Sequence, residues 1–319
     1  MKRALGYIST HRRPLTIFGG VVVVFTLILV LTALILNGVA AVATVFTPPA
    51  TATPSPSPTP TPSPSPTPVP FVNGAAEYLV DADSGKALYS ANIHNKLQMA
   101  STAKIMTAVV ALERGNPNEV VPITQSELDE VPAGVSTALL VANDRMYLSD
   151  LLYALLLPSG CDAAIVIAHA IGGTTANFVA MMNNEAQQLG LLSTHYTSPY
   201  GALPDAHQYT TVADLVTLAR HAMRIPLFAH IVGQTYYELK ATINHHDYPW
   251  NNTNDLLTTY PGANGIKTGN SSVAGYCLVF SATRDGHLLI GAELGAPDFS
   301  TLYSDATNLL NMGFVKVIL

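Results

Sequence analysis

The chain has 319 residues, of which 49% are hydrophobic and 11% charged, and it contains two cysteines, Cys161 and Cys277. This number excludes a disulfide scaffold and a cysteine-rich zinc site, and leaves open a single bridge between the two. Residues 71–319 contain all 21 acidic residues against 11 basic ones, a formal charge of −10. Such a surface argues against nucleic acid as a partner.

The N-terminal part of the chain has the pattern of a membrane segment. Residues 15–46 are apolar and uncharged. They exceed the roughly 20 residues needed to cross a bilayer and the roughly 7–15 apolar residues of a signal peptide. Four basic residues precede them, which predicts a cytoplasmic N-terminus. We expect residues 1–46 to form a cytoplasmic stub and one transmembrane signal-anchor, with the rest exported. A long signal peptide, cleaved after residues 41–43, is the alternative.

A linker follows. In residues 47–70, proline alternates with serine or threonine. Such a run cannot build a core and favours extended polyproline II. At about 3.1 Å per residue it would reach on the order of 75 Å. We interpret it as a stalk that carries one folded domain, residues 71–319.

Five segments of this domain have the pattern of strands. The first two flank the turn Asp83-Ser84-Gly85, and the last two flank Arg284-Asp285-Gly286, which contains a preferred hairpin dipeptide. Two early strands and three late ones predict one antiparallel sheet that the chain leaves and rejoins. The five segments are residues 77–80, 87–89, 265–268, 276–283 and 287–293.

The region between these strands is predicted to be helical. Apolar residues recur there at helical spacing, with start signals at Ser149 and Thr211. The fold class is therefore α/β (α+β), with a five-stranded antiparallel sheet flanked by helices and an inserted helical subdomain. The predicted helices are residues 100–113, 151–157, 162–171, a helix from residue 211 and a last one at 299–312.

Three short motifs follow one another: residues 101–104 (Ser-Thr-Ala-Lys), 159–161 (Ser-Gly-Cys) and 267–269 (Lys-Thr-Gly). Each is weak alone, but together they can build a serine nucleophile without a histidine. A serine hydroxyl needs a base to take its proton. Lys104 follows Ser101 by three residues and so shares its helix face. To act as the base it must be neutral, through burial or a neighbouring positive charge such as Lys267.

In these motifs the chain resembles the D-alanyl-D-alanine carboxypeptidases, low-molecular-mass penicillin-binding proteins, over most of residues 74–300. The resemblance also includes residues 158–164, 189–191, 252–257, 265–269 and 274–276. It implies a β-lactamase/transpeptidase-like fold without a cofactor. It implies peptidoglycan stem peptides ending in D-Ala-D-Ala as substrate and β-lactam antibiotics as covalent inhibitors. The location would be a bacterial cell membrane, with the domain outside the cytoplasm.

The resemblance also implies catalytic roles. Ser101 would be acylated by the penultimate D-Ala, with Lys104 as its base and Ser159 passing the proton to the leaving amine. Lys267 would hold this relay and lower neighbouring pKa values.

The remaining implied residues bind substrate. Thr268 would bind the terminal carboxylate, and Gly269 would let the substrate backbone approach the strand closely. The backbone N–H groups of Ser101 and Asn270 would form the oxyanion hole. Cys161 occupies a place that is most often asparagine in this family.

Three alternatives stay open. Some family branches with cysteine at the position of Cys161 resemble transpeptidases as well, so the acceptor can be an amine instead of water. A silent module that only binds the cell wall is a second reading. A class A β-lactamase is a third, but it needs a glutamate to activate water, and residues 195–199 (His-Tyr-Thr-Ser-Pro) do not supply one.

The histidines and the single tryptophan receive no chemical role. His245 and His246 are adjacent, so on a strand they would point to opposite faces, and we expect a surface loop and no metal site. Trp250 is expected to serve packing.

Overall fold

The computed structural model describes residues 72–202 and 204–318. The predicted signal-anchor and linker lie outside these residues, so both stay predictions. Among the described helices, no single one is long and apolar enough to cross a bilayer. Only α5 (Cys161–Gly172) and α6 (Thr175–Gln188) reach the required length and hydropathy, as a pair bent by 84°.

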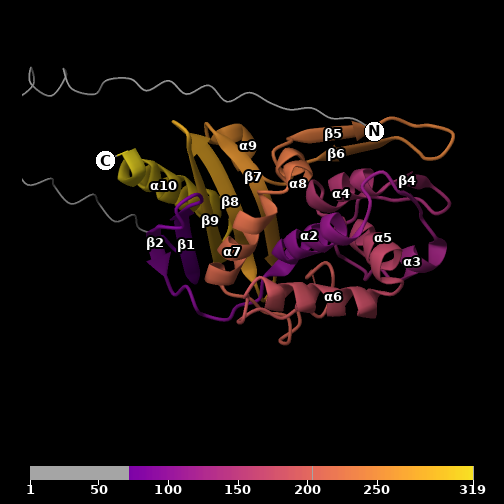
Figure 1. The fold of residues 1–319 in the computed structure, drawn as a ribbon, viewed down its shortest axis with the longest axis horizontal. Coiled ribbons are helices and arrows are strands. Elements are labelled where there is room, and N and C mark those ends of the chain that lie inside the picture. Colours follow the sequence, from indigo (N-terminus) through magenta and orange to yellow (C-terminus); the bar gives the residue numbers. More distant parts are fainter. Residues whose placement is uncertain (1–71, 203, 319) are drawn as a thin grey trace, which may run out of the picture. The chain divides into compact units, whose positions relative to one another are not determined.

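A five-stranded antiparallel sheet forms the centre of the fold (Figure 1), in the strand order β2-β1-β9-β8-β7. This confirms the predicted fold class. The two predicted hairpin turns join β1 to β2 and β8 to β9, with positive φ at Gly85, Asp285 and Gly286. The strands are β1 (Ala76–Asp81), β2 (Ala87–Ala91), β7 (Ala263–Ser271), β8 (Gly275–Arg284) and β9 (His287–Ala296).

Helices cover both faces of the sheet, with α10 on one side and the inserted block on the other (Figure 1). Thr211 caps its helix as predicted, since its side chain accepts from Asp214 N. The prediction for Ser149 was wrong: that helix starts at Leu148, because the Asp150 carboxylate accepts from Tyr147 N. Besides α5 and α6, the helices are η1 (Ala100–Ala103), α2 (Lys104–Arg114), α3 (Gln125–Asp129), α4 (Leu148–Leu156), α7 (Val212–Ala222), α8 (Pro226–Val232), α9 (Leu256–Thr259) and α10 (Phe299–Ile318).

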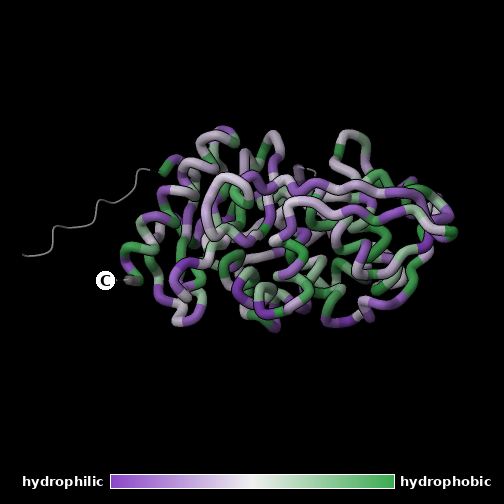
Figure 2. Tube along the Cα trace, turned by 90° about the horizontal axis from the view of Figure 1, so that it is seen from above, coloured by the Kyte–Doolittle hydropathy of each residue, from purple (hydrophilic) through white to green (hydrophobic). Residues whose placement is uncertain are grey.

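The inserted block also contains two short antiparallel strand pairs, the second of them a hairpin, that the sequence did not predict. One pairs β3 (Val120–Pro122) with β4 (Arg145–Tyr147), and the other pairs β5 (Tyr236–Leu239) with β6 (Tyr248–Asn251). The hairpin of β5 and β6 is mostly hydrophilic along its length, as the near face in Figure 2 shows.

The alternation of side chains along the strands creates two cores. Val279 and Ile290 face the inserted block, whereas their neighbours Leu278, Phe280 and Leu289 face α10. Successive residues of a strand point to opposite faces, so a sheet covered on both sides has apolar residues at consecutive positions. This packing fixes β7, at the edge of the sheet, against η1.

Candidate active site

Ser101 and Lys104 meet where η1 passes into α2. Lys104 Nζ lies 2.9 Å from Ser101 Oγ, within hydrogen-bonding distance. Ser101 belongs to the short 3-10 helix η1, and Lys104 is the first residue of α2. One helical turn therefore brings the two side chains together. Both are buried, Lys104 completely and Ser101 to 7% exposure. The pair therefore has the geometry of a nucleophile and its base.

The surroundings of Lys104 favour its neutral form. Burial lowers the pKa of its amine, and this effect outweighs the attraction of Cys161 and Asp162, which acts in the opposite direction. Its Nζ also donates to the carbonyl oxygen of Tyr200 at 3.1 Å and lies 3.4 Å from Cys161 Sγ. These contacts fix the amine in place, so that it can take a proton from Ser101.

Lys267 lies on β7 and is also fully buried. Burial, and then repulsion from Lys104, lower its pKa well below the ordinary lysine value. Of the two causes that the sequence offered for a lowered pKa of Lys104, burial is therefore the one observed, whereas the repulsion between the lysines lowers the pKa of Lys267. Lys267 Nζ donates to the backbone oxygen of Thr268 at 3.1 Å.

Ser159 stands in the short turn before α5 with a left-handed backbone, φ 65°. Ser136 fixes this turn: its hydroxyl donates to the Ser159 carbonyl at 2.7 Å, and its own carbonyl accepts from Cys161 N at 2.9 Å. Among the described residues, Ser159 Oγ is buried and has no hydrogen-bond partner. A hydroxyl held in this way is available to a bound substrate.

A cavity of about 220 Å³ brings the motifs together. Gly269 makes the approach of β7 possible, since a Cβ there would lie 2.8 Å from Ser101 N. The two lysines lie buried behind the lining. Of the predicted site residues, those that line the cavity are Ser101, Ser159, Thr268, Gly269 and Asn270.

Cys161, the first residue of α5, is predicted to bind substrate, but its side chain has no exposed surface. It contacts Lys104 and so sits behind the nucleophile. Cys161 and Cys277 are both free thiols, so they do not form the disulfide that the sequence left open.

Sequence reasoning gave no role to Thr253, which lines the cavity. Its Oγ1 lies 2.6 Å from Thr268 Oγ1, so two hydroxyls stand side by side in the lining of the cavity. A signal was present, because Thr253 lies in the run 252–257 that contributes to the resemblance. Its contact with Thr268 depends on the loop between β6 and α9.

The residues without a predicted chemical role lie in a loop and in the core. His245 and His246 lie in the loop between β5 and β6. Trp250 is buried, stacks with Tyr237 and Tyr248, and donates from Nε1 to the Ala138 carbonyl. Within residues 72–202 and 204–318, no group of three or more His, Cys, Asp or Glu side chains is arranged to hold a metal ion.

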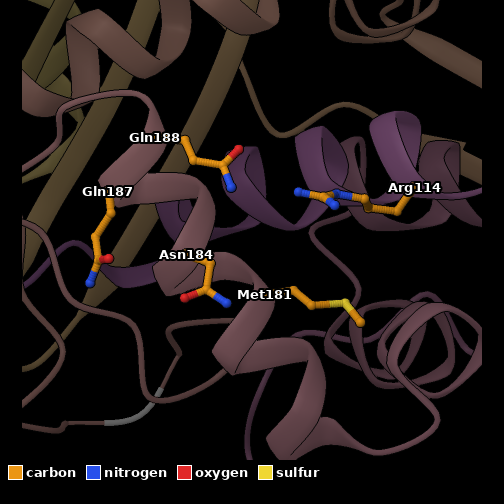
Figure 3. Close-up of a pocket in the computed structure, with 5 residues that line it drawn as sticks. All are labelled: Arg114, Met181, Asn184, Gln187 and Gln188. Carbon is orange, nitrogen blue, oxygen red and sulfur yellow. The ribbon is translucent and has the colours of Figure 1, made fainter.

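A hollow of about 450 Å³ between α2 and α6 is a different kind of surface (Figure 3). In it Arg114 extends toward Gln188, and Arg114 forms an ion pair with Glu185 at 3.3 Å. It shares no lining residue with the cavity at Ser101. Arg114 is the one ionisable side chain in that lining, which contains no nucleophile.

Comparison with known proteins agrees with this geometry. The sequence profile described as D-alanyl-D-alanine carboxypeptidase matches residues 65–298. The chain belongs to this family. It is 38% identical over 251 residues to a D-alanyl-D-alanine carboxypeptidase of Streptomyces sp. (strain K15), covering 74% of this chain and 86% of that protein.

Two further relatives show the range of the similarity. The crystal structure of the Streptomyces K15 DD-transpeptidase superposes with a TM-score of 0.74 at 36% identity, covering 78% of this chain and all of that one. The carboxypeptidase DacF of Bacillus subtilis is 29% identical over 238 residues, 74% of this chain, and the match spans only 61% of DacF.

Proposed function

We propose that this protein is a serine DD-peptidase that cleaves the terminal D-Ala from peptidoglycan stem peptides ending in D-Ala-D-Ala. The 2.9 Å contact between Ser101 Oγ and the buried amine of Lys104 carries the proposal. A neutral Lys104 takes the hydroxyl proton as Ser101 attacks the penultimate D-Ala carbonyl. The N–H groups of Ser101 and Asn270 then stabilise the oxyanion.

The leaving group needs a proton and a fixed position. Ser159 supplies the hydroxyl that passes a proton to the departing amine, with Lys267 supporting it from β7. The carboxylate of the terminal D-Ala is held by the hydroxyls of Thr268 and Thr253, which are 2.6 Å apart. Expulsion of D-Ala leaves an ester on Ser101, which water hydrolyses. A β-lactam would acylate the same serine.

Fluorescent penicillin and a D-Ala-D-Ala pentapeptide test this function. We expect the wild-type domain to be labelled covalently and to release D-Ala, detected by mass spectrometry. Ser101→Ala should abolish both signals, whereas Ser126→Ala, which changes an exposed serine, should abolish neither. Labelling that persists in Ser101→Ala would contradict the proposal. Labelling without release of D-Ala would favour the silent binding module.

A second activity, DD-transpeptidation, is favoured by one observation: Cys161 replaces the usual asparagine beside Lys104, at 3.4 Å from its amine. The structural relative from Streptomyces K15 is itself called a DD-transpeptidase. We propose that an amine can replace water in deacylating Ser101. Product analysis with and without an acceptor amine distinguishes the two reactions.

We also propose that residues 15–46 anchor the protein in the bacterial cell membrane and that residues 47–70 hold the catalytic domain outside. The uncharged apolar run and the four basic residues before it support this. Full-length protein should fractionate with membranes and lose its domain to an external protease. A soluble product starting near residue 44 would instead indicate a cleaved signal peptide.

A further inference from the structure

A second hollow, of about 570 Å³, adjoins the catalytic cavity and shares Pro158 and Thr253 with it. Thr253 belongs to the proposed carboxylate site, and Pro158 directly precedes Ser159, the proposed proton donor to the leaving amine. The shared boundary therefore lies beside the groups that handle the departing D-Ala. We call this hollow the side groove. Its lining includes Leu139, Val141, His246, Pro249 and Thr253.

The rim of the side groove exposes a large apolar side chain. Leu139 is 77% exposed and has a left-handed backbone, φ 60°. Residues other than glycine, asparagine and aspartate rarely adopt this conformation, because Cβ crowds the backbone. Backbone strain of this kind persists where the surroundings impose it, and it concentrates at functional sites.

Hydrogen bonds on both sides of Leu139 impose its left-handed backbone. The buried carboxylate of Asp162 accepts from the N–H groups of Ala138 and Leu140, at 2.8 and 3.0 Å, one on each side of Leu139. Trp250 Nε1 donates to the Ala138 carbonyl at 2.9 Å. The position of Leu139 is thus fixed from the core, through a residue at the start of the helix that follows Ser159.

The lining also contains polar side chains, among them the acidic Asp247. His246 Nδ1 lies 2.8 Å from the carboxylate of Asp144, and Asp247 follows it in the lining. The groove therefore combines an apolar rim with one acidic side chain, that of Asp247. A peptide with aliphatic groups and a free ammonium group complements both features.

We propose that the side groove binds the acceptor strand of transpeptidation, a second stem peptide with a free primary amine, and that Leu139 anchors it. This inference rests on the proposed acyl-enzyme at Ser101. The ammonium group of the acceptor first releases one proton to solvent, and the neutral amine nitrogen then attacks the ester carbonyl: a C–N amide bond forms and the bond from carbonyl carbon to Ser101 Oγ breaks. The proton of the amine passes to Ser101 Oγ by way of Ser159 or Lys104, which restores the free enzyme.

The test compares the ratio of transpeptidation to hydrolysis by mass spectrometry. The donor is a peptide ending in D-Ala-D-Ala with its own amines acetylated. The two acceptors are a stem tetrapeptide with one free side-chain amine, and glycine, which is too short to fill the groove. Both products arise from one acyl-enzyme, so the ratio reports only the later step. Leu139→Ala should lower the ratio with the tetrapeptide roughly fivefold or more, the effect of losing an apolar anchor, and leave the glycine ratio as it is.

Two further variants sharpen the test. Leu139→Asn should behave like Leu139→Ala, because asparagine tolerates the left-handed backbone but lacks the apolar side chain. Leu192→Ala is the matched control, since Leu192 is 83% exposed and does not line the groove. Its ratio should equal that of the wild type with both acceptors.

Several results would overturn the inference. These are an unchanged tetrapeptide ratio in both Leu139 variants, an equal fall with both acceptors, or no transpeptidation by the wild type. A raised KM for the donor with an unchanged ratio would assign the groove to the donor strand. Wild-type protein that penicillin does not label would overturn the proposed function as well, so the two failures are distinguishable.

Discussion

Two groups of ionisable side chains are buried against the central sheet, and they differ in sign. Lys104 and Lys267 lie between α2 and β7. Glu77, Glu293 and Asp305 lie between β1, β9 and α10, with Glu77 and Glu293 paired across neighbouring strands. Burial lowers the pKa of both lysines, and it raises the pKa of Glu77 to about 7 and of Glu293 to about 9. For these two lysines and two glutamates, burial favours the uncharged form.

The difference lies in what each group can reach. Lys104 contacts a serine hydroxyl that lines a cavity, so its amine lies within reach of a proton that a nucleophile must lose. The carboxyl cluster instead joins the start of the domain to its last helix, because the N–H and side-chain amide of Asn73 donate to Asp305. A shifted pKa therefore marks a candidate catalytic residue only together with a nucleophile and access for a substrate.

The largest expected effect is that of replacing Lys104, the buried lysine that contacts Ser101, on the rate of acylation. Lys104→Gln keeps a similar side-chain length but cannot accept the proton of Ser101, so acylation by penicillin should slow by about 10³-fold. The measurement is the second-order rate of covalent labelling, with thermal unfolding to check folding. Lys96→Gln, which changes an exposed lysine, is the control and should retain the wild-type rate. A labelling rate within tenfold of wild type in Lys104→Gln would remove Lys104 from the role of base.

The carboxyl side is tested by the dependence of stability on pH. Since the folded-state pKa values of Glu77 and Glu293 are raised above the ordinary 4.5, the folded state keeps protons that the unfolded state releases. The stabilising contribution of these carboxyls to the free energy of unfolding is fully present below about pH 4.5. It is lost as the pH rises through about 7 for Glu77 and about 9 for Glu293. The lysines act in the opposite direction, because the unfolded state binds their protons more readily.

Glu293→Gln isolates the carboxyl contribution, because glutamine resembles the protonated acid. The variant should remove a slope of about 1 kcal/mol per pH unit from the free energy of unfolding between about pH 5 and pH 8. Denaturant unfolding at several pH values measures it. Penicillin labelling at neutral pH should stay near the wild-type rate. Glu119→Gln, at an exposed position, should leave the slope unchanged. Parallel curves for wild type and Glu293→Gln would show that this carboxyl is charged in the folded protein.

A smaller effect is expected from replacing Cys161, which partly offsets the lowering of the Lys104 pKa by burial. Cys161 raises the pKa of Lys104, so Cys161→Ala should lower that pKa further. The acid limb of the rate of acylation against pH should then move to lower pH. A pH profile of penicillin labelling measures this shift, with Cys277→Ala as the control thiol. A shift toward higher pH would show that the thiol does not stabilise the ammonium form.

The sequence predicted the parts of this site that depend on local spacing. Ser101 and Lys104 meet because three residues make nearly one helical turn, and the two glycine-containing turns fix the hairpins. The fold class was confirmed, and so were all five strands of the sheet. The predicted catalytic and binding roles of these residues stay predictions until the variants are measured.

What the sequence did not predict depends on contacts between distant segments. Helix α6 is rich in asparagine and glutamine toward its end, so its apolar stripe is weak. Strand β5 is stabilised from another element, since Tyr237 stacks on Tyr153 of α4 with ring centroids 3.7 Å apart. The last helix continues past residue 312 because Phe314 is buried against the sheet. The Thr253–Thr268 contact likewise forms only when a loop closes onto β7.

The smallest expected effect concerns a charge pair that lies away from both buried groups. Arg114, which lines the hollow of Figure 3, is half exposed and pairs with Glu185. A pair of this kind contributes little, because solvent screens it and long side chains must be ordered, so Arg114→Ala should lower the free energy of unfolding by about 1 kcal/mol or less. Penicillin labelling should be unchanged, and Arg114→Lys should restore part of the stability. A loss of labelling in a folded Arg114→Ala protein would contradict this expectation. It would show that a change at the end of α2 alters the reactivity of Ser101, so that surface charge pairs affect catalysis as well as the buried lysines.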